Sequence, residues 1–143
     1  MSTTGLSVFD NTLHKTNIYL NDIMRELGSE NRHEAYIALR AVLHALRDRL
    51  TVEEATDLGA QLPIMVRGIY YEDWNPSGKP VKERHKEEFI NHVENILSGT
   101  AMSSDGERAV RSVFATLSKR VTEGEIQEVK QMLPEDIRSL WQD

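Results

Sequence analysis

Hydrophobic residues recur every three or four positions through most of the chain, a spacing typical of amphipathic α-helices. One such pattern runs from Asp10, a residue suited to an N-cap, to Gly28, a residue suited to a helix end. A second pattern begins after Asn31 and continues to Leu50. The pattern therefore predicts two long helices in the first third of the chain, each with one apolar face.

The next helix start carries a more specific signal, Thr51-Val52-Glu53-Glu54. In a capping box the threonine hydroxyl accepts from the N–H of the third helical residue, and the glutamate at that residue accepts from the N–H of the threonine. Pro63 lies where this third helix must end, and proline is well suited to open a short fourth helix. We therefore expect four helices before residue 71.

The C-terminal half repeats this plan at a distance of 71 residues. Residues 38–70 align with residues 109–141 without a gap, and ten of the 33 pairs are identical. The capping box recurs from Thr122 to Glu125, and the Leu-Pro junction recurs at Pro134. The sequence therefore predicts an all-α fold of two tandem-duplicated repeats, about four helices each, packed into one compact helical bundle domain.

The predicted domain spans residues 1–143, with one repeat at about 8–70, a linker at 71–80 and the second repeat at about 81–141. A lone unit of about 65 residues has a marginal core, so the two repeats should pack on each other. The alternative is two independent units on a flexible tether. Tyr71 and Trp74 favour a linker that folds against the body, because aromatic side chains gain from burial.

Composition narrows the classes of function. The chain has 143 residues, 17 Lys+Arg against 23 Asp+Glu, a formal net charge of −6 and no cysteine. An acidic chain without clustered cations is a poor general nucleic-acid binder, and a chain without cysteine has no disulfide or thiol nucleophile. Its apolar stretches are far shorter than a membrane span, and its N-terminal residues show no secretion signal. We expect a cytoplasmic protein that binds neither nucleic acid nor membrane.

The linker and its surroundings resemble a known family. The resemblance rests on the run Arg-Gly-Ile-Tyr-Tyr-Glu-Asp-Trp at 67–74, and then on Pro76, Pro80, Arg84-His85 and Phe89. Segments 34–36, 39–43, 46–50 and 61–63 are similar to the same family, so the similarity covers about residues 12–141.

This family is DUF2267, a bacterial domain family of unassigned function. The chain departs from its pattern at Asp73, where a glycine is expected, so the turn before Trp74 should be built differently here. The resemblance implies an all-helical fold. It supplies no catalytic residue, cofactor or partner.

Motifs of common enzyme classes are absent: the chain has no Gly-rich phosphate loop, no His-Glu-x-x-His and no nucleophile elbow. Adjacent carboxylates such as Glu53-Glu54 suit helix starts and lack the convergence that acid–base catalysis needs. His85, Glu88 and His92 share a helical face, but positions seven apart are separated by about 10 Å, so one ion cannot bridge both histidines. No catalytic residue, metal ligand or cofactor is predicted.

Three arginines recur in both halves, as Arg40/Arg111, Arg49/Arg120 and Arg67/Arg138. They can be interpreted as an anion-binding set, because the guanidinium group matches phosphate and carboxylate. They can also be interpreted as one internal ion pair that repeats. We favour the second interpretation, since duplicated residues usually report shared architecture.

The linker is the best candidate for a binding site, because it gathers three aromatic residues within five positions and adds charges of both signs. The candidate ligand-binding or partner-binding residues are Arg67, Tyr71, Asp73, Trp74 and Arg84. Trp74 has no counterpart in the second repeat, and the sequence leaves open whether it is a recognition residue or a core plug.

Two functions of different classes remain. The first is a non-enzymatic binding or adaptor module that recognises a protein or small ligand near the linker. The second is an enzyme of unrecognised type, with a site where the two repeats meet. We prefer the first, because the sequence offers no catalytic arrangement. The partner and the oligomeric state are left open.

Overall fold

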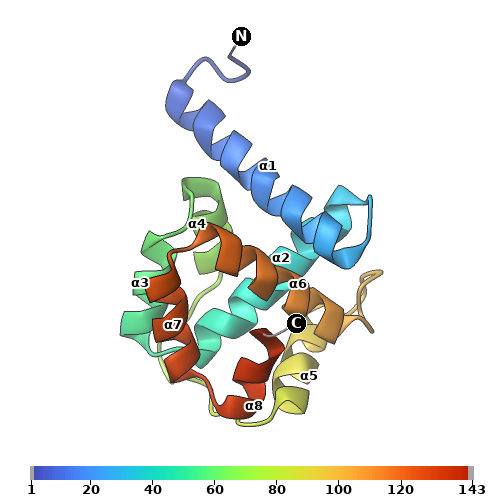
Figure 1. Ribbon diagram of the computed structural model, residues 1–143, viewed down its shortest axis with the longest axis vertical. Helices are drawn as coiled ribbons and strands as arrows, with labels where there is room; N and C mark the ends of the chain where they lie inside the picture. The colour runs from blue at the N-terminus through green and yellow to red at the C-terminus, as the bar shows by residue number, and fades with distance from the viewer. Residues whose placement is uncertain (1, 142–143) are drawn as a thin grey trace.

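The computed structural model describes residues 2–141, and the chain over this range is entirely helices, turns and loops (Figure 1). The helices are α1 (Ser7–Leu27), α2 (Arg32–Arg49), α3 (Val52–Ala60), α4 (Ile64–Tyr71), α5 (Lys86–Ile96), α6 (Gly106–Arg120), α7 (Glu123–Met132), α8 (Glu135–Arg138) and the 3₁₀ turn η1 (Ser139–Trp141). No β-strand occurs within residues 2–141, which confirms the all-α prediction.

Three of the predicted helix starts are formed by the expected side chains. Asn31 accepts hydrogen bonds from the backbone N–H groups of His33 and Glu34 and so caps α2. Thr51 and Thr122 each accept from the N–H of the residue three positions on and cap α3 and α7. At these three positions the local chemistry visible in the sequence sets the helix boundary.

Other details of the helix ends differ from the expectation. α1 begins at Ser7, ahead of Asp10, whose carboxylate accepts from the N–H of Thr4 in the preceding turn. The reciprocal half of each capping box is missing, because Glu54 and Glu125 do not reach back to the threonine N–H. Their side chains are buried where α3 packs on α7.

The two long helices α2 and α6 lie side by side at the centre, and the other helices pack around them (Figure 1). α1 packs on both α2 and α6, and α5 packs on both as well. α3 and α7 contact each other on one side of the molecule. Elements from the two halves of the chain are therefore in direct contact throughout.

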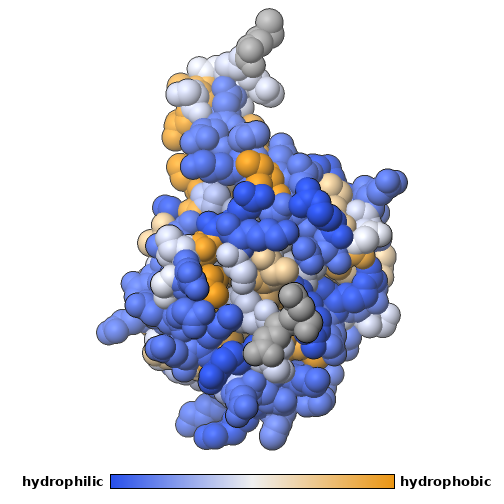
Figure 2. Space-filling model, viewed as in Figure 1, coloured by the Kyte–Doolittle hydropathy of each residue, from blue (hydrophilic) through white to orange (hydrophobic). Residues whose placement is uncertain are grey.

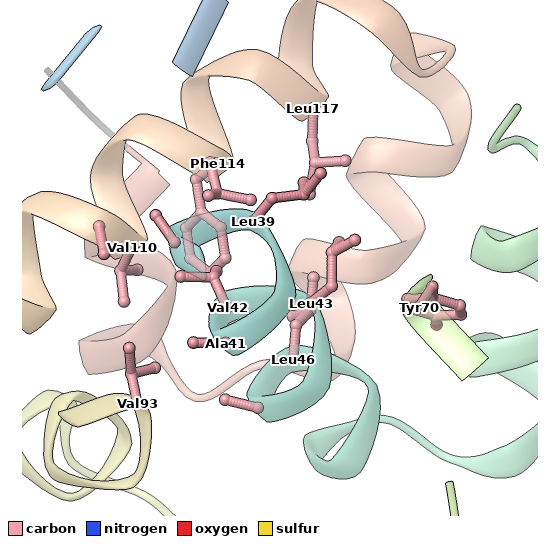
Figure 3. Close-up of a cluster of buried hydrophobic side chains, with 14 of the residues drawn as sticks. Leu39, Ala41, Val42, Leu43, Leu46, Tyr70, Val93, Val110, Phe114 and Leu117 are labelled. Atoms are coloured by element: carbon pink, nitrogen blue, oxygen red, sulfur yellow. The ribbon is translucent and has the colours of Figure 1, made fainter. Parts of the chain in front are cut away.

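The central helices supply most of the core (Figure 3). Leu39, Val42 and Leu46 of α2 face Phe114 and Leu117 of α6, and all five side chains are fully buried. Full burial of such a side chain contributes about 1.5–3 kcal/mol. The buried hydrophobic residues of both halves form one continuous cluster.

The first half of α1 stands clear of the body (Figure 1). Apolar residues at its start remain half exposed, with 51% of Val8 and 53% of Phe9 accessible to solvent, as is 51% of the N-cap residue Leu6. Figure 2 shows hydrophobic side chains on the projecting part of the molecule. The α1 helix therefore has a buried end that joins the core and an exposed end with an uncovered apolar surface.

Candidate functional site

The loop between α4 and α5, residues 72–85, extends the predicted linker to the start of α5, and this longer segment, called the linker below, runs along α2. The backbone N–H of Val81 donates to the carbonyl of Asp48 at 2.8 Å, and Arg49 donates through Nε to the carbonyl of Glu83 at 2.7 Å. The Lys79-Pro80 peptide bond is cis. The linker is thus held on the body by hydrogen bonds.

The turn at the start of the linker has an unusual backbone conformation. Asp73 has a φ of 60°, in the left-handed region where glycine is the usual residue. Aspartate is among the few other residues that enter this region with ease. Its carboxylate also lies 3.5 Å from the guanidinium of Arg40. Asp73 therefore makes, without glycine, a turn of the kind that glycine usually makes.

Tyr71 and Trp74 pack against each other across this turn, with ring centroids 5.4 Å apart and the ring planes tilted by 33°. Trp74 is half-buried against the core, and its indole N–H is buried without a hydrogen-bond acceptor among the described residues. Tyr71 lies over Gly59 of α3. Burial raises the pKa of Tyr71, while the nearby charge of Arg67 acts in the opposite direction. Most of this aromatic pair is packed, and only part of it faces solvent.

Arg67 has a structural role at the end of α3. Its guanidinium donates to the carbonyls of Gly59 and Leu62, at 3.0 and 2.8 Å, and so closes the C-terminal end of α3. Arg138 donates to the carbonyl of Leu133 in the same way. Arg67 and Arg138 therefore share a structural role, as predicted. Their partners are carbonyl oxygens, however, and not the acidic side chains of an ion pair.

Arg49 and Arg120 have different partners in the two halves. Arg49 donates to the carbonyl of Glu83, whereas Arg120 pairs with Asp22 of α1. The interpretation as one repeated ion pair is wrong for these two residues. Arg40 pairs with Glu72, and the contacts of Arg111 include an ion pair with Glu107.

The structure brings together only part of the predicted set. Tyr71 and Trp74 are in ring contact, and Arg67 is close enough to Tyr71 to influence its pKa. The carboxylate of Asp73 pairs with the guanidinium of Arg40. Arg84 is exposed at the far end of the linker, and no hydrogen bond, ion pair or ring contact of the described residues joins it to the other four.

A hollow of about 530 Å³ lies between α1 and the junction of α3 with α4. We call it the α1 groove. It is lined by Val8, Asn11, Thr12, Lys15, Ile18, Tyr19, Ala60, Gln61, Leu62, Pro63, Ile64, Arg67 and Arg120. Arg67 is the one predicted site residue in this lining, so the groove adjoins the linker set at a single point.

The walls of the α1 groove are tied together, and they combine apolar with polar side chains. The hydroxyl of Thr12 accepts from the N–H of Met65 at 2.9 Å, which fixes α1 to the start of α4. On the α4 side, Ile64 is 57% exposed. The sequence contains a signal for this surface. Val66 and Tyr70 occupy the buried face of α4, so the apolar residues Ile64 and Met65 must lie on another face of that helix.

The lining residues of the α1 groove also share one sign of charge. Lys15, Arg67 and Arg120 carry the charges in this lining, and it contains no carboxylate. This is notable in a chain whose net charge is −6. The groove therefore combines an apolar surface with a basic rim.

Comparison of the sequence with models of known protein families identifies the family of this chain. A family model described as an uncharacterised conserved protein (DUF2267) matches residues 16–140 of the 143-residue chain. A search of the curated proteins gives no match to this chain. Among the described helices, none combines the length and the apolar character that crossing a bilayer requires.

Proposed function

This chain belongs to the DUF2267 family of uncharacterised conserved proteins, and we propose that it is a non-enzymatic binding module. The observation that carries the proposal is the α1 groove, a hollow of about 530 Å³ that the projecting helix α1 leaves open beside α4. This volume falls in the range of about 300–1,000 Å³ that is typical of ligand-binding pockets.

The chemistry of the groove indicates the partner. Val8 and Ile64 offer apolar contacts on opposite walls, and Lys15 and Arg67 offer positive charge beside them. A helix with one apolar face and flanking acidic residues is complementary to both features. The proposed partner is an acidic amphipathic segment of another protein.

The linker residues extend this surface. Arg67 lines the groove, and Tyr71 is its neighbour on the side of the linker. Recognition near the linker, as expected from the sequence, is thus proposed as an adjoining contact. The enzymatic alternative has no observation in its favour at these residues, because Arg67 is engaged by carbonyl groups and Asp73 by Arg40.

A peptide titration tests the binding proposal. Synthetic amphipathic helices of leucine with glutamate are added to the ¹⁵N-labelled chain, and NMR chemical shifts are followed. We expect shifts centred on Val8, Lys15 and Ile64, and loss of binding in Ile64→Asp. Matched peptides with lysine in place of glutamate should bind less well. Val52→Asp is the control, since Val52 is also exposed but lies outside the groove lining. Shifts elsewhere, or equal binding of both peptides, would contradict the proposal.

We further propose that the two halves arose by tandem duplication and pack about an approximate two-fold axis. The support is the pattern of helix contacts: α2 packs on α6 and α3 on α7, while α1 packs on α6 as α5 packs on α2. Thr51 and Thr122 cap equivalent helices, and Pro63 and Pro134 have φ, ψ of −57°, 154° and −57°, 152°. The outer helices differ in length, since α1 has 21 residues and α5 has 11.

The duplication proposal predicts that the halves depend on each other. Residues 8–70 and 81–141 expressed as separate chains should associate when mixed, as seen by circular dichroism and gel filtration. Halves that fold stably alone and do not associate would contradict it. We also propose that the protein is bacterial and cytoplasmic. This proposal is separate from the duplication and rests on the family resemblance and the composition.

A further inference from the structure

Two carboxylates meet in the interior where α3 packs on α7. Glu54 and Glu125 occupy the third position of these two helices, and each is only 8% exposed. Their carboxyl groups are close enough to share a hydrogen bond. The contact joins the two halves of the chain at equivalent positions.

These buried oxygen atoms lack partners. Glu54 Oε1 and Glu125 Oε2 are inaccessible to solvent and accept no hydrogen bond from any described residue. The nearby hydroxyl of Tyr70 is not free to donate, because it donates to the carbonyl of Ala55 at 2.7 Å. A buried carboxylate oxygen without a donor is costly to the fold. Such an atom needs a proton or a cation beside it.

Asp57 and Glu128 complete the cluster one helical turn further on. Carboxylate oxygens of Glu54, Asp57 and Glu128 all lie within 4.8 Å of one another. Oxygen ligands on opposite sides of Ca²⁺ are about 4.6–5.2 Å apart, from metal–oxygen distances of about 2.3–2.6 Å. The separation therefore allows these oxygens to contact one ion, and Asp57 and Glu128 are exposed, which leaves it a path from solvent.

The electrostatics of the cluster are one-sided. Burial, together with the hydrogen bond and charge of Glu54 and the charges of Glu128 and Asp57, raises the pKa of Glu125 to about 8. Each of these influences acts against ionisation, and none comes from a cation.

We propose that Glu54, Asp57 and Glu128 form a binding site for one divalent cation with a preference for oxygen ligands, of which Ca²⁺ is the probe of choice. Glu54 supplies the buried ligand, whose Oε1 has no hydrogen-bond donor among the described residues, and Asp57 and Glu128 supply exposed ligands at the mouth. The cation then links α3 to α7 and stabilises the folded chain.

This site goes beyond the sequence prediction, which named no metal ligand. That prediction considered carboxylates adjacent in the chain and histidines on one helix face. The relevant signal was the alignment of the halves, in which Glu54 matches Glu125 and Asp57 matches Glu128. Helix packing converts these two matched pairs into one cluster.

Calorimetric titration tests the proposal. Ca²⁺ is added to the full chain, freed of metal with EDTA, at pH 8. We expect a binding heat that saturates at one Ca²⁺ per chain, and a higher thermal midpoint with Ca²⁺ than with EDTA. Mn²⁺, followed by electron paramagnetic resonance, should compete for the same site.

Variants at the exposed pair keep the test independent of folding. Asp57→Asn with Glu128→Gln should weaken Ca²⁺ binding at least about tenfold. Glu53→Gln with Glu123→Gln removes the same charge from exposed positions in the first turns of the same helices and should change affinity less than about twofold. Glu54→Gln should also abolish binding, if the variant folds.

Three results would overturn the proposal. The first is the absence of heat and of any midpoint shift with millimolar Ca²⁺, Mg²⁺ or Mn²⁺, which would show that the cluster binds no divalent cation. The second is Ca²⁺ binding that survives in Asp57→Asn/Glu128→Gln. The third is an equal loss of binding in Glu53→Gln/Glu123→Gln, which would show a general response to charge.

Discussion

Arg120 donates a hydrogen bond through Nε to Oδ2 of Asp22 at 2.7 Å, across 98 positions of the chain. Asp22 is buried on α1, and Arg120 is the last residue of α6. Burial acts to raise the pKa of Asp22, but the hydrogen bond and charge of Arg120 outweigh it and hold this pKa below its ordinary value of 3.8. The pair fixes the buried part of α1 to the second half of the chain.

Asp22→Asn should therefore lower the free energy of unfolding by about 1–3 kcal/mol, because Arg120 loses its charged partner while the introduced amide stays buried. Urea denaturation at pH 7 measures the loss. A group with a lowered folded pKa stabilises above its unfolded pKa, and this stability is lost as the pH falls. The difference between wild type and variant should thus shrink below about pH 4. The exposed pair Arg111–Glu107 is the control, and Glu107→Gln should cost less than about 0.5 kcal/mol.

Gly59→Ala should destabilise the protein, although alanine normally favours a helix. A Cβ at this position would lie 2.2 Å from the Tyr71 hydroxyl and 2.7 Å from the ring carbon that bears it. We expect a cost of about 1–3 kcal/mol in urea denaturation. Gly68→Ala is the control: nothing lies within 4 Å of its Cβ, so it should stabilise α4 by about 0.5–1 kcal/mol. Combining Gly59→Ala with Tyr71→Ala should recover part of the loss, and a purely additive double variant would contradict the clash.

Thr51→Ala and Thr122→Ala should each cost about 0.5–2 kcal/mol, because each removes the acceptor for an N–H at a helix start. The sequence alone predicts additive effects, since the sites lie in different halves. Thr56→Ala is the control, because its hydroxyl bonds to backbone carbonyls inside α3 and caps nothing. Denaturant titrations that give no loss at Thr51 or Thr122 would mean that α3 and α7 start elsewhere.

Glu125→Gln should change how stability depends on pH. The pKa of Glu125 is raised from 4.5 to about 8 by burial and by Glu54, so the folded chain holds a proton that the unfolded chain releases. The stabilisation is complete below about pH 4.5 and is lost as the pH rises towards about 8. Relative to wild type, the variant should gain about 1–4 kcal/mol between pH 5 and pH 8.5 in metal-free buffer. Glu53→Gln should show no such gain, and parallel pH profiles for Glu125→Gln and wild type would contradict the prediction.

Trp74→Ala should lower stability by about 1–3 kcal/mol, less than the 3–5 kcal/mol of a fully buried tryptophan, because the indole is only half-buried. Trp74→Phe keeps the ring beside Tyr71 and removes the N–H that lacks an acceptor, so it should be close to neutral. Urea denaturation of both variants measures this. A loss of full core size in Trp74→Ala, with peptide binding intact in the folded fraction, would remove Trp74 from the recognition surface.

The sequence predicts the fold well where one residue determines a boundary locally. Thr51, Thr122 and Asn31 cap helices because a side-chain oxygen two or three residues from an N–H needs no tertiary contact. The partners of Arg49 and Arg120 could not be predicted in this way. Arg49 meets the linker and Arg120 meets α1, and these contacts exist only once the helices are packed.

The candidate site was predictable only in part. The aromatic linker motif pointed to Tyr71 and Trp74, which do pack together. The α1 groove was missed because its apolar residues come from segments more than 50 positions apart, as Val8 and Ile64 do. Apolar residues with helical spacing predict a buried face, and sequence periodicity does not tell which stretch of a long helix extends beyond the body.

The packing of α1 on α6 sets the order of events during synthesis. The ribosome releases α1 to α4 well before residues 106–120 emerge and form α6. Until then, the face of α1 that contains Ile23 and the face of α2 that contains Leu39 lack the cover that α6 gives them in the folded chain. The nascent first half is therefore a natural client for chaperones that hold exposed apolar helices, and its final fold is reached only near the end of translation.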